Sequence, residues 1–215
     1  MYGRPVRFGV LGPLEVSGED GPLALGGPKQ WTVLAHLVLG ANQVVPAEHL
    51  IDAVWGEELP EDPKSTLQVH VSRLRSALGS NAIEGRAPGY LLRADPEEVD
   101  ALRFEALLRA ARGAVVEPRV AARTLAEALE LWRGPALADL AGEPSLLGEI
   151  ARLEELRLQA IEEKIAAELD LSHTAEAVAE LETPDPHPPP PRAATGRVDA
   201  RPVPLGPAGG RPLGL

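Results

Sequence analysis

The chain has 215 residues and a formal net charge of −11, and it contains no cysteine. The lack of cysteine excludes a disulfide framework and any thiolate metal site. The first 15 residues lack the charged start and apolar run of a signal peptide, and no stretch approaches the roughly 20 apolar residues that span a bilayer. We therefore expect a cytoplasmic chain of one or two domains with no membrane partner.

The acidic side chains are unevenly distributed. Residues 1–95 hold 8 basic and 11 acidic side chains, residues 96–183 hold 9 and 19, and residues 184–215 hold 4 and 2. Between positions 64 and 94, only Glu84 opposes five basic side chains. Because salt screens charges beyond about 10 Å, a local cationic surface can exist within an acidic protein. The charge therefore permits contact with nucleic acid without indicating it.

Residues 1–95 carry sheet and helix signals in turn. Short apolar runs predict strands at 7–11, 14–16 and 23–25, and the segments 82–83 and 90–92 predict a β-hairpin around Gly-Arg-Ala-Pro-Gly. Periodic apolar residues predict helices at 28–39, 46–55 and 64–78. Sheet, three helices and hairpin in this order indicate an α+β winged helix-turn-helix domain.

The next segment, 96–183, changes to helical periodicity. We expect helices at 102–111, 120–132 and about 146–171, followed by a short helical piece at 174–181. Helical pairs of this size predict an all-α, tetratricopeptide-like domain, although no strict repeat of about 34 residues is visible. Residues 184–215 hold 10 of the 22 prolines and no helical period, so they predict a disordered tail.

The helix at 64–78 is the candidate DNA-reading element. Its stripe of Leu67, Val71, Leu74 and Leu78 predicts one buried face and leaves the opposite face to solvent. An α-helix fits the major groove, where polar side chains reach the edges of the bases. The side chains on the exposed face or beside it are Lys64, Ser65, Thr66, Gln68, Val69, Ser72, Arg73, Arg75 and Ser76.

Each of these side chain types suits a particular contact. Gln68 can pair with adenine, and Arg73 with guanine or a phosphate, while Ser65, Thr66 and Ser72 suit either kind of contact. Lys64 and Arg75 flank the face and suit phosphates, and Arg86 at the hairpin tip can enter a narrow minor groove. An amphipathic helix with an ordinary solvated face would show a similar pattern, so composition leaves both interpretations open.

Catalysis finds little support in the sequence. The five histidines form no HExxH motif or paired ligand spacing, and no GxxxxGK[ST] loop is present. Paired carboxylates such as Glu154 and Glu155 fit the charged surface of a helix. We expect neither an enzyme nor a bound cofactor or metal.

Several motifs are together similar to one known family. The winged-helix motifs are Leu-Gly-Pro-Leu-Glu-Val at 11–16, Leu-Gly-Gly-Pro-Lys-Gln at 25–30, Leu-Ile-Asp-Ala-Val-Trp-Gly at 50–56, the segment 67–79 and Pro-Gly-Tyr-Leu-Leu at 88–92. The helical part carries Leu-Trp-Arg-Gly-Pro-Ala-Leu-Ala-Asp-Leu at 131–140. Over about 180 residues the chain resembles the Streptomyces antibiotic regulatory protein family, with an OmpR-type winged helix and a bacterial transcriptional activator domain.

The resemblance implies a nucleoid-associated activator of a secondary-metabolite gene cluster. Family members bind promoter direct repeats side by side, which implies a homodimer on DNA, and recruit RNA polymerase holoenzyme through its sigma factor. Arg86 matches the family's wing arginine. His70 matches a histidine of the family's recognition helix. Two roles stay open for it, contact with a phosphate or packing beside the buried stripe. The loop between the second and third helices matches the family's polymerase-facing loop. It would equally fit a solvated connection without a partner. Its acidic residues are Glu57, Glu58, Glu61 and Asp62.

The resemblance ends at Glu182. We hypothesise that the tail is an out-of-frame reading of further helices, because codons exist for 201–213 that give a helical, family-like string one nucleotide later. Codons incompatible with that string would exclude it. Missing helices would leave apolar side chains uncovered at Ile161, Ile165, Leu169 and Leu181.

A second hypothesis for the whole chain is a helical protein-interaction module whose winged domain does not bind DNA.

Overall fold

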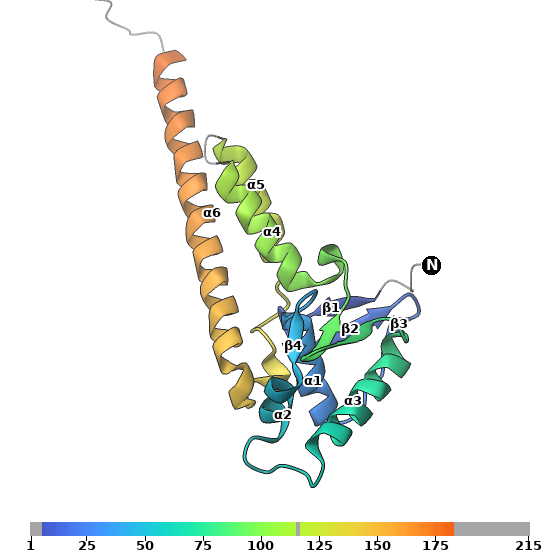
Figure 1. The fold of residues 1–215 in the computed structure, drawn as a ribbon. Coiled ribbons are helices and arrows are strands. Elements are labelled where there is room, and N and C mark those ends of the chain that lie inside the picture. The colour runs from blue at the N-terminus through green and yellow to red at the C-terminus, as the bar shows by residue number, and fades with distance from the viewer. Residues whose placement is uncertain (1–5, 115–116, 183–215) are drawn as a thin grey trace, which may run out of the picture.

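The computed structural model describes residues 6–114 and 117–182, with side chains described as far as residue 174. A winged-helix region of two small sheets and three helices is followed by a helical region dominated by one long helix (Figure 1). This confirms the predicted α+β winged helix followed by an all-α region. The predicted disorder and reading frame of residues 184–215 lie outside the described residues, as does the side chain of Leu181.

The first sheet is a three-stranded antiparallel meander in the order β1-β2-β3. Gly18 pairs with Gly21, so only two residues form the turn between β2 and β3, and Gly21 takes a φ of +111° there. The turn is therefore tighter than the sequence predicted, and the third strand begins before residue 23. The strands are β1 (Arg7–Gly9), β2 (Glu15–Gly18) and β3 (Gly21–Pro22).

Three helices and a second sheet complete the winged-helix region. The predicted stripe of Leu67, Val71, Leu74 and Leu78 is buried against the core, as expected. The second sheet has the order β4-β6-β5, and its first strand was not predicted. The helices are α1 (Pro28–Leu39), α2 (Ala47–Trp55) and α3 (Pro63–Leu78), and the strands are β4 (Val44–Pro46), β5 (Ile83–Arg86) and β6 (Gly89–Leu92).

The helical region begins with an antiparallel pair packed along a long third helix (Figure 1). Three short 3₁₀ turns, η1 (Pro96–Glu98), η2 (Ala138–Leu140) and η3 (Pro144–Leu146), join its parts. The α-helices are α4 (Asp100–Gly113), α5 (Pro118–Glu130) and α6 (Leu147–Glu182).

Helix α6 is continuous, so the predicted separate piece at 174–181 was wrong. Residues 172 and 173 separate the two predicted helical segments. Instead, the Ser172 hydroxyl donates to the Glu168 carbonyl at 3.1 Å and the Thr174 hydroxyl donates to the Asp170 carbonyl at 2.8 Å. Both polar side chains are thereby satisfied within the helix, which runs through them.

The two regions are joined by backbone hydrogen bonds and share one hydrophobic core. Phe8 forms a parallel β-bridge with Val99, and the Leu137 N–H donates to the Val10 carbonyl at 3.0 Å. The Arg133 N–H donates to the Leu11 carbonyl at 2.7 Å. The predicted division at residues 95 and 96 therefore lies beside a packed interface.

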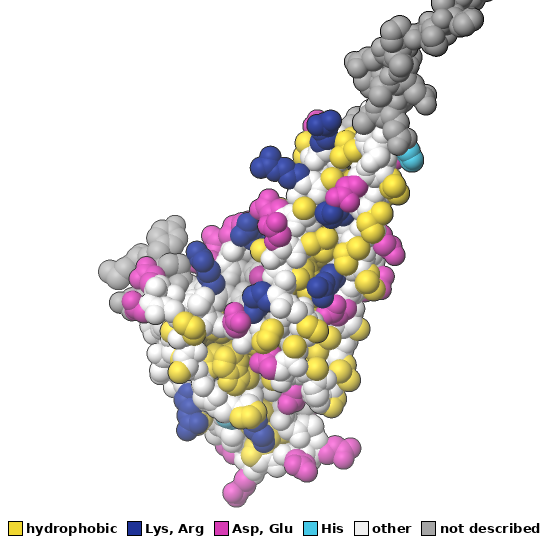
Figure 2. All heavy atoms as spheres, turned by 180° about the vertical axis from the view of Figure 1, so that it is seen from behind, with side chains coloured by type: hydrophobic (Ala, Val, Ile, Leu, Met, Phe, Trp, Pro, Cys, Tyr) yellow, Lys and Arg dark blue, Asp and Glu magenta, His cyan; other side chains and the backbone are white. Residues whose placement is uncertain are grey.

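One face of α6 is left uncovered. Large apolar side chains at Leu158, Ile161, Ile165 and Leu169 are 56%, 36%, 50% and 53% exposed. Exposure of the last three of these residues was predicted from the sequence. Figure 2 shows hydrophobic side chains along the edge of the molecule that α6 forms. The spacing of three, four and four residues places all four on one side of the helix.

Candidate nucleic-acid interface

Helix α3 begins at a side-chain cap. Asp62 accepts the Ser65 backbone N–H at 3.0 Å and the Ser65 hydroxyl at 2.6 Å, and its backbone carbonyl accepts the Thr66 hydroxyl at 2.7 Å. The hydrogen bonds from Ser65, first that of its side chain and then that of its backbone, hold the pKa of the Asp62 carboxyl below its usual value. The hydroxyls of Ser65 and Thr66 are engaged in starting the helix, and their contact with bases stays a prediction.

The outward face of α3 is open to solvent. Lys64, Gln68, Ser72 and Arg73 are exposed there, and Val69 in their midst is 50% exposed. Helix α3 packs against α1, α2 and β5 with its other side. In Figure 1 it lies on the side of the molecule away from α6, so the helical region leaves this face uncovered. A helix of 16 residues measures about 24 Å, long enough to lie in a major groove.

The β5-β6 hairpin forms the wing beside this face. Arg86 is the last paired residue of β5 and its side chain is 53% exposed, which suits a reaching role. Its guanidinium also lies 3.1 Å from the Glu84 carboxylate, and Arg93 binds the same carboxylate. The hydrogen bond from Arg93 is the main reason that the pKa of Glu84 is lowered. Glu84 therefore neutralises part of the charge of the wing.

Arg75 connects the wing to α3. Its Nε donates to the Ile83 carbonyl at 2.8 Å, and its guanidinium lies 6.0 Å from the ring centroid of Tyr90. The side chain is half-buried between α3 and the hairpin. The phosphate contact expected from the sequence stays a prediction, but the structure gives Arg75 a positioning role that the sequence did not indicate.

His70 packs on Trp55. The two ring centroids lie 5.8 Å apart, and the His70 Nδ1 atom is buried without a hydrogen-bond partner. Burial and, to a lesser degree, the charges of Arg73 and Lys29 lower the pKa of His70. The lowered pKa favours the neutral imidazole, and the geometry supports the packing interpretation. Contact with a phosphate stays a prediction.

The loop between α2 and α3 is fully accessible. Glu57, Glu58 and Glu61 are exposed, and Leu59 among them is 53% exposed. The fourth acidic residue, Asp62, differs from these three because it caps α3. The loop thus presents three exposed carboxylates and one exposed apolar side chain beside the candidate interface.

Comparison with known proteins agrees with this architecture. The family model of the bacterial transcriptional activator domain matches residues 99–186, and that of the transcriptional regulatory protein, C terminal, matches residues 22–92. The regulatory protein AfsR of Streptomyces coelicolor is 37% identical over 179 residues, which are 82% of this chain and 18% of AfsR. The transcriptional regulator RedD of the same organism is 33% identical over 192 residues, covering 84% of this chain and 54% of RedD. The chain belongs to the Streptomyces antibiotic regulatory protein family.

A solved structure shares this fold over most of the chain. Mycobacterium tuberculosis EmbR, in complex with a low affinity phosphopeptide, superposes with a TM-score of 0.75 at 34% identity, over 84% of this chain and 50% of EmbR. The chain spans from about a fifth to about half of the length of the relatives it matches. The curated relatives are named as regulators.

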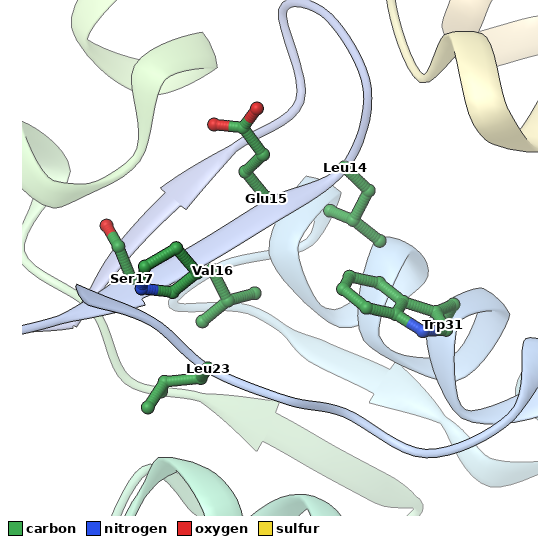
Figure 3. Close-up of a pocket in the computed structure, with 7 residues that line it drawn as sticks. Leu14, Glu15, Val16, Ser17, Leu23 and Trp31 are labelled. Atoms are coloured by element: carbon green, nitrogen blue, oxygen red, sulfur yellow. The ribbon is translucent and has the colours of Figure 1, made fainter.

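Elsewhere on this family member, a small pocket lies between β2 and α1. It measures about 130 Å³ and is bordered by Leu14, Val16, Leu23 and Trp31. Its one carboxylate, Glu15, points away from Trp31 (Figure 3) and lies 2.9 Å from Arg133. Among the side chains that the structure describes, which end at residue 174, no cluster suits a metal ion. Within residues 6–114 and 117–182, no helix is both long and apolar enough to cross a membrane. The α3 face is therefore the stronger candidate site.

Proposed function

We propose that the chain is a sequence-specific DNA-binding transcriptional activator of a secondary-metabolite gene cluster, acting at the nucleoid in the cytoplasm. The observation that carries this proposal is the open face of α3. Gln68 and Arg73 are exposed there, and neither forms a hydrogen bond or ion pair with another described residue. Their donors are free to read adenine and guanine in the major groove. Arg86 then reaches the adjacent minor groove from the wing.

Binding by the full chain is tested by fluorescence anisotropy on promoter duplexes from its own gene neighbourhood. We expect salt-dependent binding to a duplex that carries direct repeats, and a loss of about tenfold or more for Arg73→Ala. Arg109→Ala is the matched control, because Arg109 is an exposed arginine on α4. Equal binding by wild type and Arg73→Ala would exclude α3 as the reader.

Activation needs a surface that remains accessible on DNA. The loop of Glu57, Glu58 and Glu61 lies at the start of α3 and is exposed, which supports contact with RNA polymerase holoenzyme through its sigma factor. Changing all three to glutamine should leave DNA affinity unchanged and lower transcription in a reconstituted assay. A matched control changes the same number of exposed carboxylates elsewhere, at Glu130, Glu155 and Glu162.

Assembly on direct repeats as a homodimer is part of the same proposal. Two copies side by side should give two shifted species on a duplex with both repeats and one on a duplex with a single repeat. One species on both duplexes would contradict the paired arrangement.

The exposed stripe on α6 favours a second candidate function, a helical protein-interaction module. Leu158, Ile161, Ile165 and Leu169 offer an apolar ridge that a partner helix could cover. This candidate predicts that replacing Gln68, Arg73 and Arg86 leaves partner binding intact. The DNA-binding proposal predicts that the same triple replacement abolishes promoter binding.

A further inference from the structure

A lysine outside α3 lies beside the candidate interface. Lys29 is the second residue of α1, and its Nζ is 5.4 Å from the ring centroid of Trp55 at the end of α2. The same indole packs against His70 of α3 at 5.8 Å. Trp55 therefore lies between the first turn of α1 and the middle of α3. The cation–π contact with this indole holds the Lys29 side chain on the α3 side of α1.

The charges at this junction are not balanced. Lys29 and Arg73 are both exposed, and each acts on His70 through its positive charge. Among the residues that the structure describes, no carboxylate forms an ion pair with either cation. In contrast, Arg86, Arg93 and Arg112 each have a carboxylate partner. Two positive charges without a carboxylate partner among the described residues attract an anion from outside the protein.

We propose that Lys29 binds a backbone phosphate of the DNA strand bordering the groove that α3 enters. The inference rests on the proposed function and adds a contact from α1 that the recognition helix itself does not provide. Lysine suits this contact because its ammonium acts as a point charge toward any phosphate oxygen. A phosphate contact fixes the position of α3 in the groove and carries no sequence information.

The test compares Lys29→Gln with wild type in the full chain. The probes are a promoter duplex that wild type binds and a scrambled duplex of equal length and base composition, each titrated between 50 and 200 mM KCl. Loss of one phosphate contact should reduce the slope of log K against log salt by about 0.9, which is about an eightfold loss of affinity at 0.1 M salt. Both duplexes should lose affinity by the same factor.

Two variants separate charge from folding. Lys29→Arg retains the charge and should keep the wild-type slope, whereas Arg109→Gln removes an exposed charge from α4 and should change nothing. The melting temperature of Lys29→Gln should stay close to that of wild type, because the residue is exposed and an exposed cation–π contact stabilises only slightly.

The outcomes distinguish the inference from the proposed function. A wild-type slope for Lys29→Gln, with wild type binding normally, overturns the phosphate contact alone. A loss confined to the promoter duplex also overturns it, because it would indicate a base contact. Failure of wild type to bind either duplex overturns the proposed function and the inference together.

Discussion

Asp100, at the start of α4, accepts the backbone N–H of Val10 with both carboxylate oxygens, at 2.8 and 3.0 Å, across 90 residues of sequence. The same carboxylate accepts the Leu11 N–H at 3.0 Å and lies 3.2 Å from the Arg133 guanidinium. Its side chain is 14% exposed, and this burial raises the pKa of Asp100 despite the three donor groups around it. One side chain thus fastens the helical region to the end of β1.

We expect Asp100→Ala to lower the free energy of unfolding by about 2–4 kcal/mol, because two backbone N–H groups and a guanidinium lose their acceptor. Urea denaturation followed by circular dichroism measures the change. Asp170→Ala, at an exposed position on α6, is the control and should have little effect. A loss below about 0.5 kcal/mol for Asp100→Ala would show that the fastening does not depend on this carboxylate.

Two glycines of the wing should respond differently to the same substitution. A Cβ on Gly89 would collide with the Val45 carbonyl oxygen and lie 2.7 Å from the Ala47 nitrogen, both backbone atoms of the neighbouring segment. A Cβ on Gly85 would meet only the end of Arg75 at 3.9 Å. Gly89→Ala should therefore cost about 1–3 kcal/mol and displace the wing from β4, while Gly85→Ala should be close to neutral. Thermal melting of the two variants side by side tests this, and equal melting temperatures would contradict it.

The sequence predicted what depends on local periodicity. The buried stripe of α3 follows from apolar residues at the helical period of 3.6 residues. The cap at Asp62 was not predicted, because this residue was assigned only to the preceding acidic loop. The contact of Arg75 with the Ile83 carbonyl could not be predicted, because it depends on the distance between a helix and a hairpin. Neither could the position of Lys29 beside Trp55 and α3, since these neighbours belong to other helices. Strand β4 has only three residues, too few for an alternating pattern.

A chain of hydrogen bonds crosses the interface between the two regions near α1. The Ser145 hydroxyl donates to the Ala53 carbonyl at 3.2 Å, so it accepts from the Nε2–H of His36 at 3.1 Å. The Nδ1 of His36 is then an acceptor, and the Nε2–H of His49 donates to it at 3.3 Å. The chain runs in one direction and requires a neutral His36. A proton on Nδ1 would remove the acceptor that His49 uses.

Stability should therefore fall as the solution is acidified. Burial, and next the charge of His49, lower the pKa of His36 from 6.5 to about 4, against the raising effect of Glu149. The unfolded chain binds a proton below pH 6.5 and the folded chain resists it, so stability is complete above pH 6.5 and is lost toward pH 4. The loss should reach at most about 3 kcal/mol. Urea midpoints across this range measure it. His36→Gln should flatten the dependence of the urea midpoint on pH. His173→Gln, at an exposed position on α6, is the control and should leave that dependence unchanged. If His36→Gln keeps the wild-type pH profile, the loss of stability in acid comes from other groups.

Val69 should recognise a thymine methyl group if α3 enters the major groove. Its side chain is 50% exposed in the middle of a polar face, between Gln68 and Arg73 in the outward row. Covering a methyl group with an apolar side chain stabilises a complex by about 0.8 kcal/mol, or about fourfold in affinity. Replacing thymines of a bound promoter duplex by uracil, one at a time, removes only that methyl group. Wild type should lose about fourfold at one position of each repeat, and Val69→Ala should bind the thymine and uracil duplexes equally. If no thymine-to-uracil replacement changes the affinity of wild type, Val69 lies outside the groove and α3 has a different orientation on DNA.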